Sequence, residues 1–174
     1  MYFWTADQHF GHANVLRFSN RPFDDLHHMH KELTKRHNEV VSPQDITIHV
    51  GDFALVNNKA KAYEYLSKLN GQHILLRGSH DKWMDKTYHE IWEKTIEGKH
   101  IIACHYAMLT FPRSHYDSWQ VFGHSHGRLQ HPLLGKQYDV GVDNNDYYPV
   151  SFEQLKEIMS GLPDNFNSLK NRKN

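Results

Sequence analysis

Carboxylate and imidazole side chains recur along this sequence in short polar runs, each of which follows an apolar stretch. The runs, in order, are Asp7-Gln-His9, Gly51-Asp52, Gly78-Ser-His-Asp81, His105 and Gly123-His-Ser-His126. Aspartate and histidine bind transition-metal ions, and histidine also transfers protons near neutral pH. Each run alone is equally typical of a turn or a solvated loop. The runs therefore indicate a metal-binding or catalytic site only if they lie close together in the folded protein.

The apolar stretches before these runs have the length and composition of β-strands. Strands are expected at residues 2–5, 46–50, 73–77, 99–104, 119–122 and 138–142. Helices are expected at residues 24–41, 57–70, 86–97 and 151–159. In an α/β sheet the carboxyl ends of the strands line one crevice, so we expect the polar runs to converge there.

The last polar run gives the strongest local signal. In extended chain, His124 and His126 lie on the same side because successive side chains alternate. The whole chain has 16 histidines, nearly as many as its 20 lysines and arginines. Most histidines are expected to be ordinary surface residues, so position rather than abundance selects the candidates.

Length, charge and cysteine content indicate one globular domain in a reducing compartment. For 174 residues we expect a single domain at residues 1–162 and a polar, frayed tail at residues 163–174. The formal net charge is +0, which predicts no general attraction to nucleic acids or membranes. Cys104 is the lone cysteine, so no internal disulfide can form. The start of the chain has no signal-like segment, and we expect a soluble, cytoplasmic protein.

The ordered set of motifs resembles the calcineurin-like metallophosphoesterases. The resemblance extends from residue 1 to about residue 150 and covers Asp-x-His, Gly-Asp, Gly-x-His-Asp, His and Gly-His-x-His, each at a strand end. Two further runs are similar to the small cap-less bacterial and phage members of that superfamily. They are Asp7-Gln-His-Phe-Gly-His12 with Arg21-Pro-Phe23, and Asp139-Val-Gly-Val-Asp143 with Pro149-Val-Ser-Phe152. The resemblance implies an α/β fold, a four-layer α-β-β-α sandwich.

The resemblance also implies a centre for two divalent transition-metal ions. The ligands implied for the first ion are Asp7, His9, Asp52 and His126. The ligands implied for the second ion are Asp52, which bridges the two, His105, His124 and the residue at position 79. Mixed imidazole and carboxylate ligands suit manganese, with iron, zinc or nickel as alternatives, better than calcium or magnesium.

The implied activity is hydrolysis of phosphomono- or phosphodiesters. A water that bridges two such ions, about 3.5–4 Å apart, becomes a hydroxide near neutral pH and attacks phosphorus. His80 matches the histidine that acts as general acid on the leaving group, and Asp81 matches its orienting partner. The partner is expected to be a phosphate ester, either a small molecule or a nucleotide. No cap domain fits between the motifs, which favours an open crevice and therefore diesters or larger substrates.

Position 79 departs from the family pattern, which has asparagine there. Ser79 has a shorter side chain and a poorer metal-ligating atom, so we expect the second ion to lack one ligand or to take a water. Natural tolerance, an engineered substitution and a natural loss of activity would each explain the serine, although the intact ligands elsewhere argue against a loss. The alternative function is a non-catalytic, metal-dependent binding module on the same fold. A purely structural zinc site is a third reading.

Four further side chains are candidate contacts for the substrate phosphate. His12 and Arg21 lie in the branch-specific runs, and a role in loop structure is the alternative for both. Arg77 precedes the catalytic turn and Arg128 follows the last ligand pair, so each is either a bidentate fork for phosphate or a solvated arginine. Cys104 lacks the glycine-rich loop of a thiol phosphatase and is expected to be a packed residue. Aromatic residues without a basic stripe give no strong nucleic-acid signal.

Overall fold

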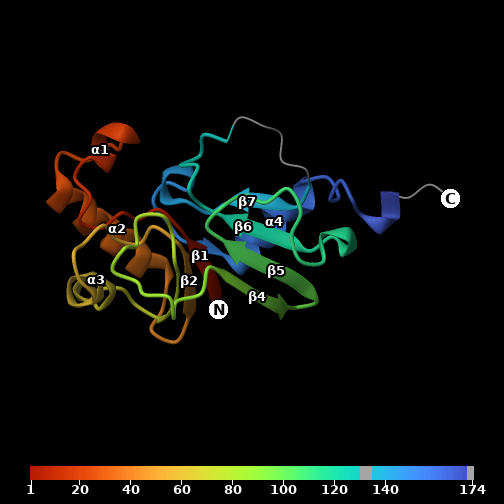
Figure 1. Cartoon of the computed structure of the whole chain (residues 1–174), viewed down its shortest axis with the longest axis horizontal. Helices are drawn as coiled ribbons and strands as arrows, with labels where there is room; N and C mark the ends of the chain where they lie inside the picture. The colour runs from red at the N-terminus through yellow and green to blue at the C-terminus, as the bar shows by residue number, and fades with distance from the viewer. Residues whose placement is uncertain (130–134, 172–174) are drawn as a thin grey trace.

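The computed structural model describes residues 1–129 and 135–171, which contain two four-stranded sheets (Figure 1). The strand order in the first sheet is β3-β2-β1-β8. Its strands are β1 (Tyr2–Thr5), β2 (Ile46–Val50), β3 (Gln72–Leu76) and β8 (Val150–Ser151). Strands β1, β2 and β3 are parallel, with Trp4 opposite Ile48 and Ile48 opposite Ile74, whereas β8 is antiparallel to β1.

The second sheet has the strand order β4-β5-β6-β7. Its strands are β4 (Ile91–Ile96), β5 (Lys99–Cys104), β6 (Trp119–Phe122) and β7 (Gln137–Asp139). Strands β5, β6 and β7 are parallel, and β4 pairs with β5 in the antiparallel direction. The two sheets are linked just beyond β1 and β7, where Ala6 pairs with Gly141. The carboxyl ends of parallel strands from both sheets therefore meet at one end of the fold.

Capping residues define where the helices begin. The α-helices of the described residues are α1 (Val15–Phe18), α2 (Leu26–Val40), α3 (Lys59–Leu66) and α4 (Phe152–Gly161). Asp25 and Asn58 accept hydrogen bonds from backbone N–H groups in the first turns of α2 and α3. Ser151 and Gln154 form the predicted capping box of α4. Within residues 1–129 and 135–171, no helix is long and apolar enough to cross a membrane.

An apolar core fills the space between the two sheets. Its almost fully buried members from the strands include Trp4, Ile48, Leu76, Ile101 and Val121. Helix α4 closes this core beside β8 and β7, and its Phe152 ring lies 6.3 Å from the Trp4 ring. The sheets are thus packed face to face by the alternating inward residues of their strands.

Helices cover the outer face of the first sheet, whereas an irregular segment covers the outer face of the second. Met29 and Leu33 of α2 and Leu66 of α3 pack over the first sheet in a second apolar cluster. Over the second sheet lies the segment 105–118 with the 3-10 helix η1 (Ser114–Tyr116), and Gln120 of β6 bonds to its backbone. The predicted α/β fold with two packed sheets is confirmed, and most of its fourth layer is this irregular segment.

Residues 86–97 do not form the predicted helix. Strand β4 occupies the second half of that range and makes a hairpin with β5. Glu97 and Gly98 form the two-residue turn with φ angles of 47° and 75°, the left-handed pair that suits a tight hairpin. Trp92 and Ile96 pack against the core while the residues next to them are exposed. Pairing with β5 across a tight turn therefore prevails over helix propensity here.

The tail that was expected to fray is packed as far as residue 171. Asn165 is 1% exposed, and its side-chain amide donates to the carbonyl oxygen of Ser114. The Ser168 hydroxyl donates to the Asp117 carboxylate. The expectation is wrong for these residues because their polar side chains bond the irregular segment over the second sheet. Residues 172–174 lie outside the described residues.

Three histidines, of which His37 and His49 are buried, lie together between the first sheet and α2. His49 of β2 is 0% exposed, and its ring nitrogens lie 3.0 Å from Gln8 Nε2 and 3.1 Å from His73 Nδ1. The ring of His37 in α2 is stacked on His49 with 6.2 Å between centroids, and its Nε2 bonds the Asn70 carbonyl. Burial lowers the pKa of His37 to about 4 and holds the pKa of His49 well below its ordinary value. Neutral imidazoles are therefore part of the packing.

Acidification should destabilise the protein through these histidines. Below pH 6.5 the unfolded chain takes up a proton at His37, whereas the folded protein takes it up only near pH 4. The stabilisation from His37 is complete above pH 6.5 and declines by about 3 kcal/mol as the pH falls to 4. His37→Gln should therefore flatten the pH dependence of the free energy of unfolding, measured with urea. His27→Gln, an exposed position on the same helix, is the control, and an unchanged slope in His37→Gln would contradict the explanation.

Candidate metal centre

The aspartate and histidine residues predicted as metal ligands converge where the parallel strands of the two sheets end. The loops that carry them follow β1, β2, β5 and β6. The residues form two groups, Asp7 with His9 and His126, and Asp52 with His105 and His124. Within each group the ligand atoms lie within 4.8 Å of one another. All six predicted aspartate and histidine ligands are thus brought together from four loops.

Most of these ligands have a left-handed backbone conformation. The φ angles are 60° for Asp7, 55° for His9, 54° for Asp52, 67° for His124 and 48° for His126. Such angles are uncommon outside glycine, and each costs on the order of 1–3 kcal/mol. Strain of this kind persists only where the surrounding structure enforces it, and it clusters at functional sites.

The Asp52 carboxylate lies between the two groups. Its Oδ2 is 3.7 Å from His9 Nε2 and 3.3 Å from His105 Nε2. Both nitrogens are buried, and neither has a hydrogen-bond partner among the described residues. A buried polar nitrogen without a partner is costly unless another group binds it. The residues of both groups therefore fit divalent metal ions.

Hydrogen bonds hold the far side of three ligand rings. His105 Nδ1 lies 3.0 Å from a backbone carbonyl oxygen at the end of β2, and His126 Nδ1 lies 2.6 Å from Asp143 Oδ2. His9 Nδ1 lies 3.2 Å from His12 Nδ1. Metal-binding histidines in proteins have this arrangement, because the bond at one ring nitrogen fixes the tautomer and leaves the other nitrogen for the ion.

Arg21 supports the ligands and is not available to a substrate. Its buried guanidinium forms two 2.8 Å bonds with the Asp143 carboxylate, which in turn holds His126. It also donates to the backbone carbonyls of Asp7 and Gln8. Burial acts to raise the pKa of Asp143, but the bonds from His126 and Arg21 outweigh it and lower the pKa. Sequence reasoning missed this role of Asp143, for which the Asp139-Val-Gly-Val-Asp143 run was the available signal.

Burial and neighbouring charges set the ionisation of the two buried carboxylates. Asp7 is 0% exposed, and burial raises its pKa to about 7. Burial also acts to raise the pKa of Asp52, but the His105 imidazole outweighs it and lowers the pKa. At His105 burial acts to lower the pKa, and Asp52 raises it overall. Asp52 is therefore the fixed negative charge of the site, whereas Asp7 would have to lose a proton to bind a metal ion.

The turn after β3 packs directly on Asp52. A Cβ atom at Gly78 would lie 2.3 Å from both the backbone nitrogen and Oδ1 of Asp52, so only glycine allows this approach. The Ser79 hydroxyl donates to Asp52 Oδ2 at 3.1 Å. Ser79 thus lies beside the second group but bonds the shared carboxylate, and the ligands gathered there are Asp52, His105 and His124.

Asp81 does not orient His80, contrary to the prediction. Its carboxylate accepts hydrogen bonds from the backbone N–H groups of Asp52 at 2.7 Å, Gly78 at 2.9 Å and Ala54 at 3.1 Å, and from the Trp83 indole at 3.2 Å. These donors surround both carboxylate oxygens. Asp81 instead ties the loop after β2 to the turn after β3, and burial raises its pKa.

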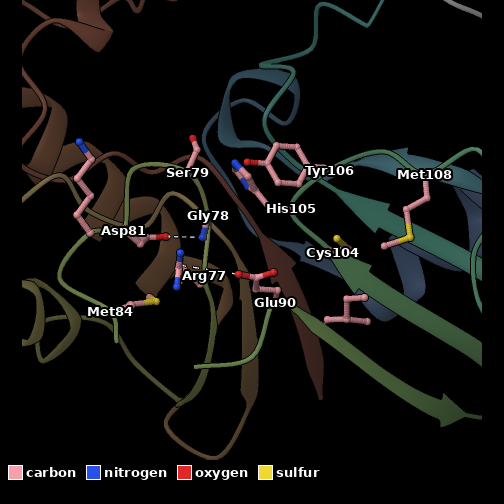
Figure 2. Close-up of a pocket in the computed structure, with 12 residues that line it drawn as sticks. Arg77, Gly78, Ser79, Asp81, Met84, Glu90, Cys104, His105, Tyr106 and Met108 are labelled. Atoms are coloured by element: carbon pink, nitrogen blue, oxygen red, sulfur yellow. Dashed lines mark hydrogen bonds and ion pairs between the residues drawn. The ribbon is translucent and has the colours of Figure 1, made fainter. Parts of the chain in front are cut away.

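The predicted arginine contacts have different surroundings. Arg77 lines a cavity next to the second group, and its Nε is 4.0 Å from the Glu90 carboxylate (Figure 2). Arg128 is exposed and donates to the backbone carbonyl of Phe18. Arg77 is therefore placed where a bound ligand could reach it, whereas Arg128 belongs to neither ligand group.

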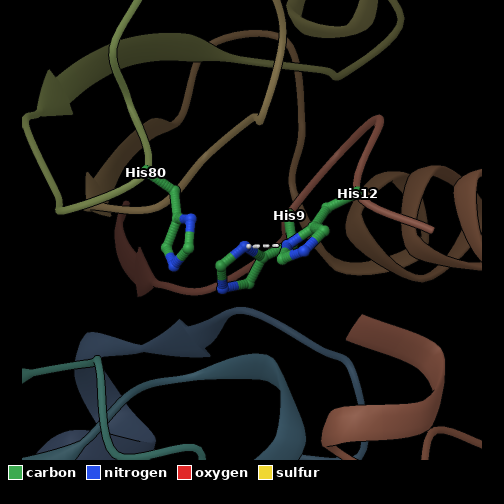
Figure 3. A group of neighbouring side chains, drawn as sticks. All are labelled: His9, His12 and His80. Carbon is green, nitrogen blue, oxygen red and sulfur yellow. Dashed lines mark hydrogen bonds between the residues drawn. The ribbon is translucent and has the colours of Figure 1, made fainter. Parts of the chain in front are cut away.

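His12 and His80 form a third cluster with His9 (Figure 3). The His80 ring centroid is 5.0 Å from that of His9 and 5.3 Å from that of His12. His80 Nε2 lies 4.0 Å from Asp52 Oδ2, and the His80 side chain is 42% exposed. Burial lowers the pKa of His12. Two partly exposed imidazoles therefore border the buried ligands.

Removing the charge of Asp143 should weaken metal binding without removing a ligand. Asp143→Asn keeps the shape of the side chain but weakens its hold on the His126 ring and on Arg21. Loss of such an orienting partner lowers metal affinity about 10–100-fold, which titration calorimetry with Mn²⁺ would measure. Asp146→Asn, at an exposed position nearby, is the matched control. An unchanged affinity in Asp143→Asn would show that this support is unnecessary.

Comparison with known proteins places the chain among relatives of nearly its own length. No model of a protein family matches it. It is 34% identical over 162 residues to the uncharacterized protein MJ1445 of Methanocaldococcus jannaschii, which covers 88% of each chain. Among solved structures, the protein of unknown function AQ665 from Aquifex aeolicus has a TM-score of 0.71 at 24% identity, over 91% of this chain and 98% of that one.

A mutant of Vps29 from Entamoeba histolytica gives a TM-score of 0.46 at 17% identity, over 80% of this chain and 72% of that one. The AQ665 likeness shows a shared fold. The identity with MJ1445 extends over most of both sequences. The chain therefore belongs to the same protein family as MJ1445.

Proposed function

We propose that this protein is a calcineurin-like, two-metal phosphoesterase that hydrolyses phosphomono- or phosphodiesters. The observation that carries the proposal is the position of Asp52, whose Oδ2 lies within 4.0 Å of ring nitrogens of His9, His80 and His105. One carboxylate shared by two groups of imidazole and carboxylate ligands is the arrangement that a two-metal site needs.

The ligand groups assign a set of residues to each ion. The first set is Asp7, His9, His126 and Asp52, and the second is Asp52, His105 and His124. Manganese suits these donors, with iron, zinc or nickel as alternatives. When bound, a pair of such ions lowers the pKa of a water and neutralises phosphoryl oxygens. The residues around them then have to orient the ester and supply a proton.

His80 is the residue we assign to that proton. As the water oxygen bonds to phosphorus, the bond from phosphorus to the ester oxygen breaks, and the His80 ring gives its proton to that oxygen. The His80 backbone N–H donates to Asp52 Oδ1 at 2.7 Å, which fixes the start of the side chain beside the ligands. Asp81 is a positioning residue. Its carboxylate accepts a hydrogen bond from the backbone N–H of Asp52 and so holds Asp52 beside His80.

Hydrolysis of simple aryl phosphates tests the proposal. Manganese-loaded protein should hydrolyse bis(4-nitrophenyl) phosphate or 4-nitrophenyl phosphate and should contain two ions per chain by elemental analysis. Asp52→Asn removes the shared charge, so it should lose bound metal and about 10³-fold in rate, because each ion contributes several kcal/mol to the transition state. Asp24→Asn, at an exposed position, controls for the substitution itself. An Asp52→Asn protein with two ions and full activity would refute the assignment.

Ser79 supports the alternative of a metal-dependent binding module, because its hydroxyl bonds Asp52 rather than completing the second group. Ser79→Asn should restore a longer oxygen donor, raise the affinity for the second ion and increase the rate, each by about tenfold if one neutral ligand is gained. Ser160→Asn, at an exposed position in α4, is the control. Two bound ions without hydrolysis in either protein would favour the binding module.

A further inference from the structure

We propose that the cavity beside the second ligand group binds the organic part of a phosphoester and selects a flat heteroaromatic ring. The cavity has a volume of about 700 Å³ and lies between the turn after β3 and the end of β5 (Figure 2). This inference rests on the proposed function only for where the phosphate sits. The preference for one kind of organic group comes from the walls of the cavity itself.

The cavity is continuous with the candidate metal centre through two residues. Ser79 and His105 both line it, and both approach Asp52 Oδ2, at 3.1 Å and 3.3 Å. A phosphoryl group held at the ligand groups therefore has the cavity next to it. Cavities that hold drug-sized ligands measure roughly 300–1,000 Å³, far more than a bare phosphate occupies. The remaining space suits the group to which the phosphate is attached.

One part of the cavity wall is apolar and rich in sulfur. Met84 and Met108 lie on opposite sides with Cys104 and the Tyr106 ring also in the wall (Figure 2). Methionine sulfur makes favourable contacts with aromatic rings, each contributing about 0.3–1.5 kcal/mol. Tyr106 is exposed, and its ring centroid is only 5.0 Å from that of His105, so it extends the wall toward the ligand group. A planar ring that lies against either methionine gains such a contact, which a sugar or an alkyl chain lacks.

The other part of the wall carries a pair of opposite charges. Arg77 Nε lies 4.0 Å from Glu90 Oε1, and the two side chains are 39% and 68% exposed. A guanidinium offers several donors and a carboxylate only acceptors, so together they can meet both kinds of group on the edge of a heteroaromatic ring. An alkyl chain would remove water from both charges and replace none of their hydrogen bonds. The wall therefore favours a heteroaromatic group over an aliphatic one.

Phosphonates test this preference without turnover, because a carbon–phosphorus bond replaces the ester bond. The probes are 2-(adenin-9-yl)ethylphosphonate, hexylphosphonate and inorganic phosphate, titrated calorimetrically into the manganese-loaded full chain. We expect the adenine compound to bind about tenfold more tightly than hexylphosphonate or phosphate, which one sulfur–ring contact together with hydrogen bonds to Arg77 and Glu90 would supply. Similar affinities for the three, a preference for the hexyl compound, or binding of none of them would overturn the inference.

A filling substitution locates the site. Ile91 lines the cavity and is 46% exposed, so Ile91→Trp should fill part of the space while the protein still folds. It should lower the affinity for the adenine compound about tenfold and leave that for inorganic phosphate unchanged. Leu109→Trp, at a 69% exposed position outside the cavity lining, is the matched control. An equal loss for both probes in Ile91→Trp, or no loss for either, would contradict the assignment.

The two proposals fail in different ways. Persistent selectivity for the adenine compound without hydrolysis of any aryl phosphate would remove the proposed activity and keep the ring-binding site. Hydrolysis of aryl phosphates together with equal affinity for the three probes would keep the activity and remove the site.

Discussion

The buried negative charge of Asp52 is the constraint on which the rest of the site depends. The residue is 2% exposed, and a charge in such a place is stable only when hydrogen bonds and opposite charges surround it. The backbone N–H of His80, the Ser79 hydroxyl and the nearby His105 ring supply that surrounding. Since these groups come from the turn after β3 and from the end of β5, one carboxylate organises loops of both sheets.

The sandwich makes this arrangement possible because it holds the loop ends rigidly. Each left-handed ligand residue is strained, and the strain has to be offset by packing elsewhere. The core between the sheets provides that packing through residues such as Trp4 and Ile101, both 0% exposed. The ligands thus lie just beyond the carboxyl ends of buried strands. A site built in this way is organised largely before an ion or a substrate arrives.

Most of the ligand set could be predicted from the sequence, because apolar runs that end in Asp or His mark strand ends and parallel strands bring their ends together. Strand β4 could not be predicted, because the spacing of Trp92 and Ile96 also suits a helix. Only the pairing with β5 makes this segment a strand. Asp81 was assigned to its sequence neighbour His80, yet adjacency along the chain does not fix where a side chain points. Its partners at the end of β2 are distant in sequence, as Arg21 is from Asp143.

The chain of contacts through Arg21 also connects the helical layer to the ligands. Arg21 Nη1 lies 3.3 Å from the sulfur of Met29, a fully buried residue of α2, while the same guanidinium grips Asp143 and so the ring of His126. Repacking of α2 against the first sheet would be transmitted to a ligand on the far sheet. The residues that pack α2 on the first sheet are therefore constrained by the position of the His126 ring as well as by folding. Substitutions at Met29 should be accompanied by compensating changes around Arg21.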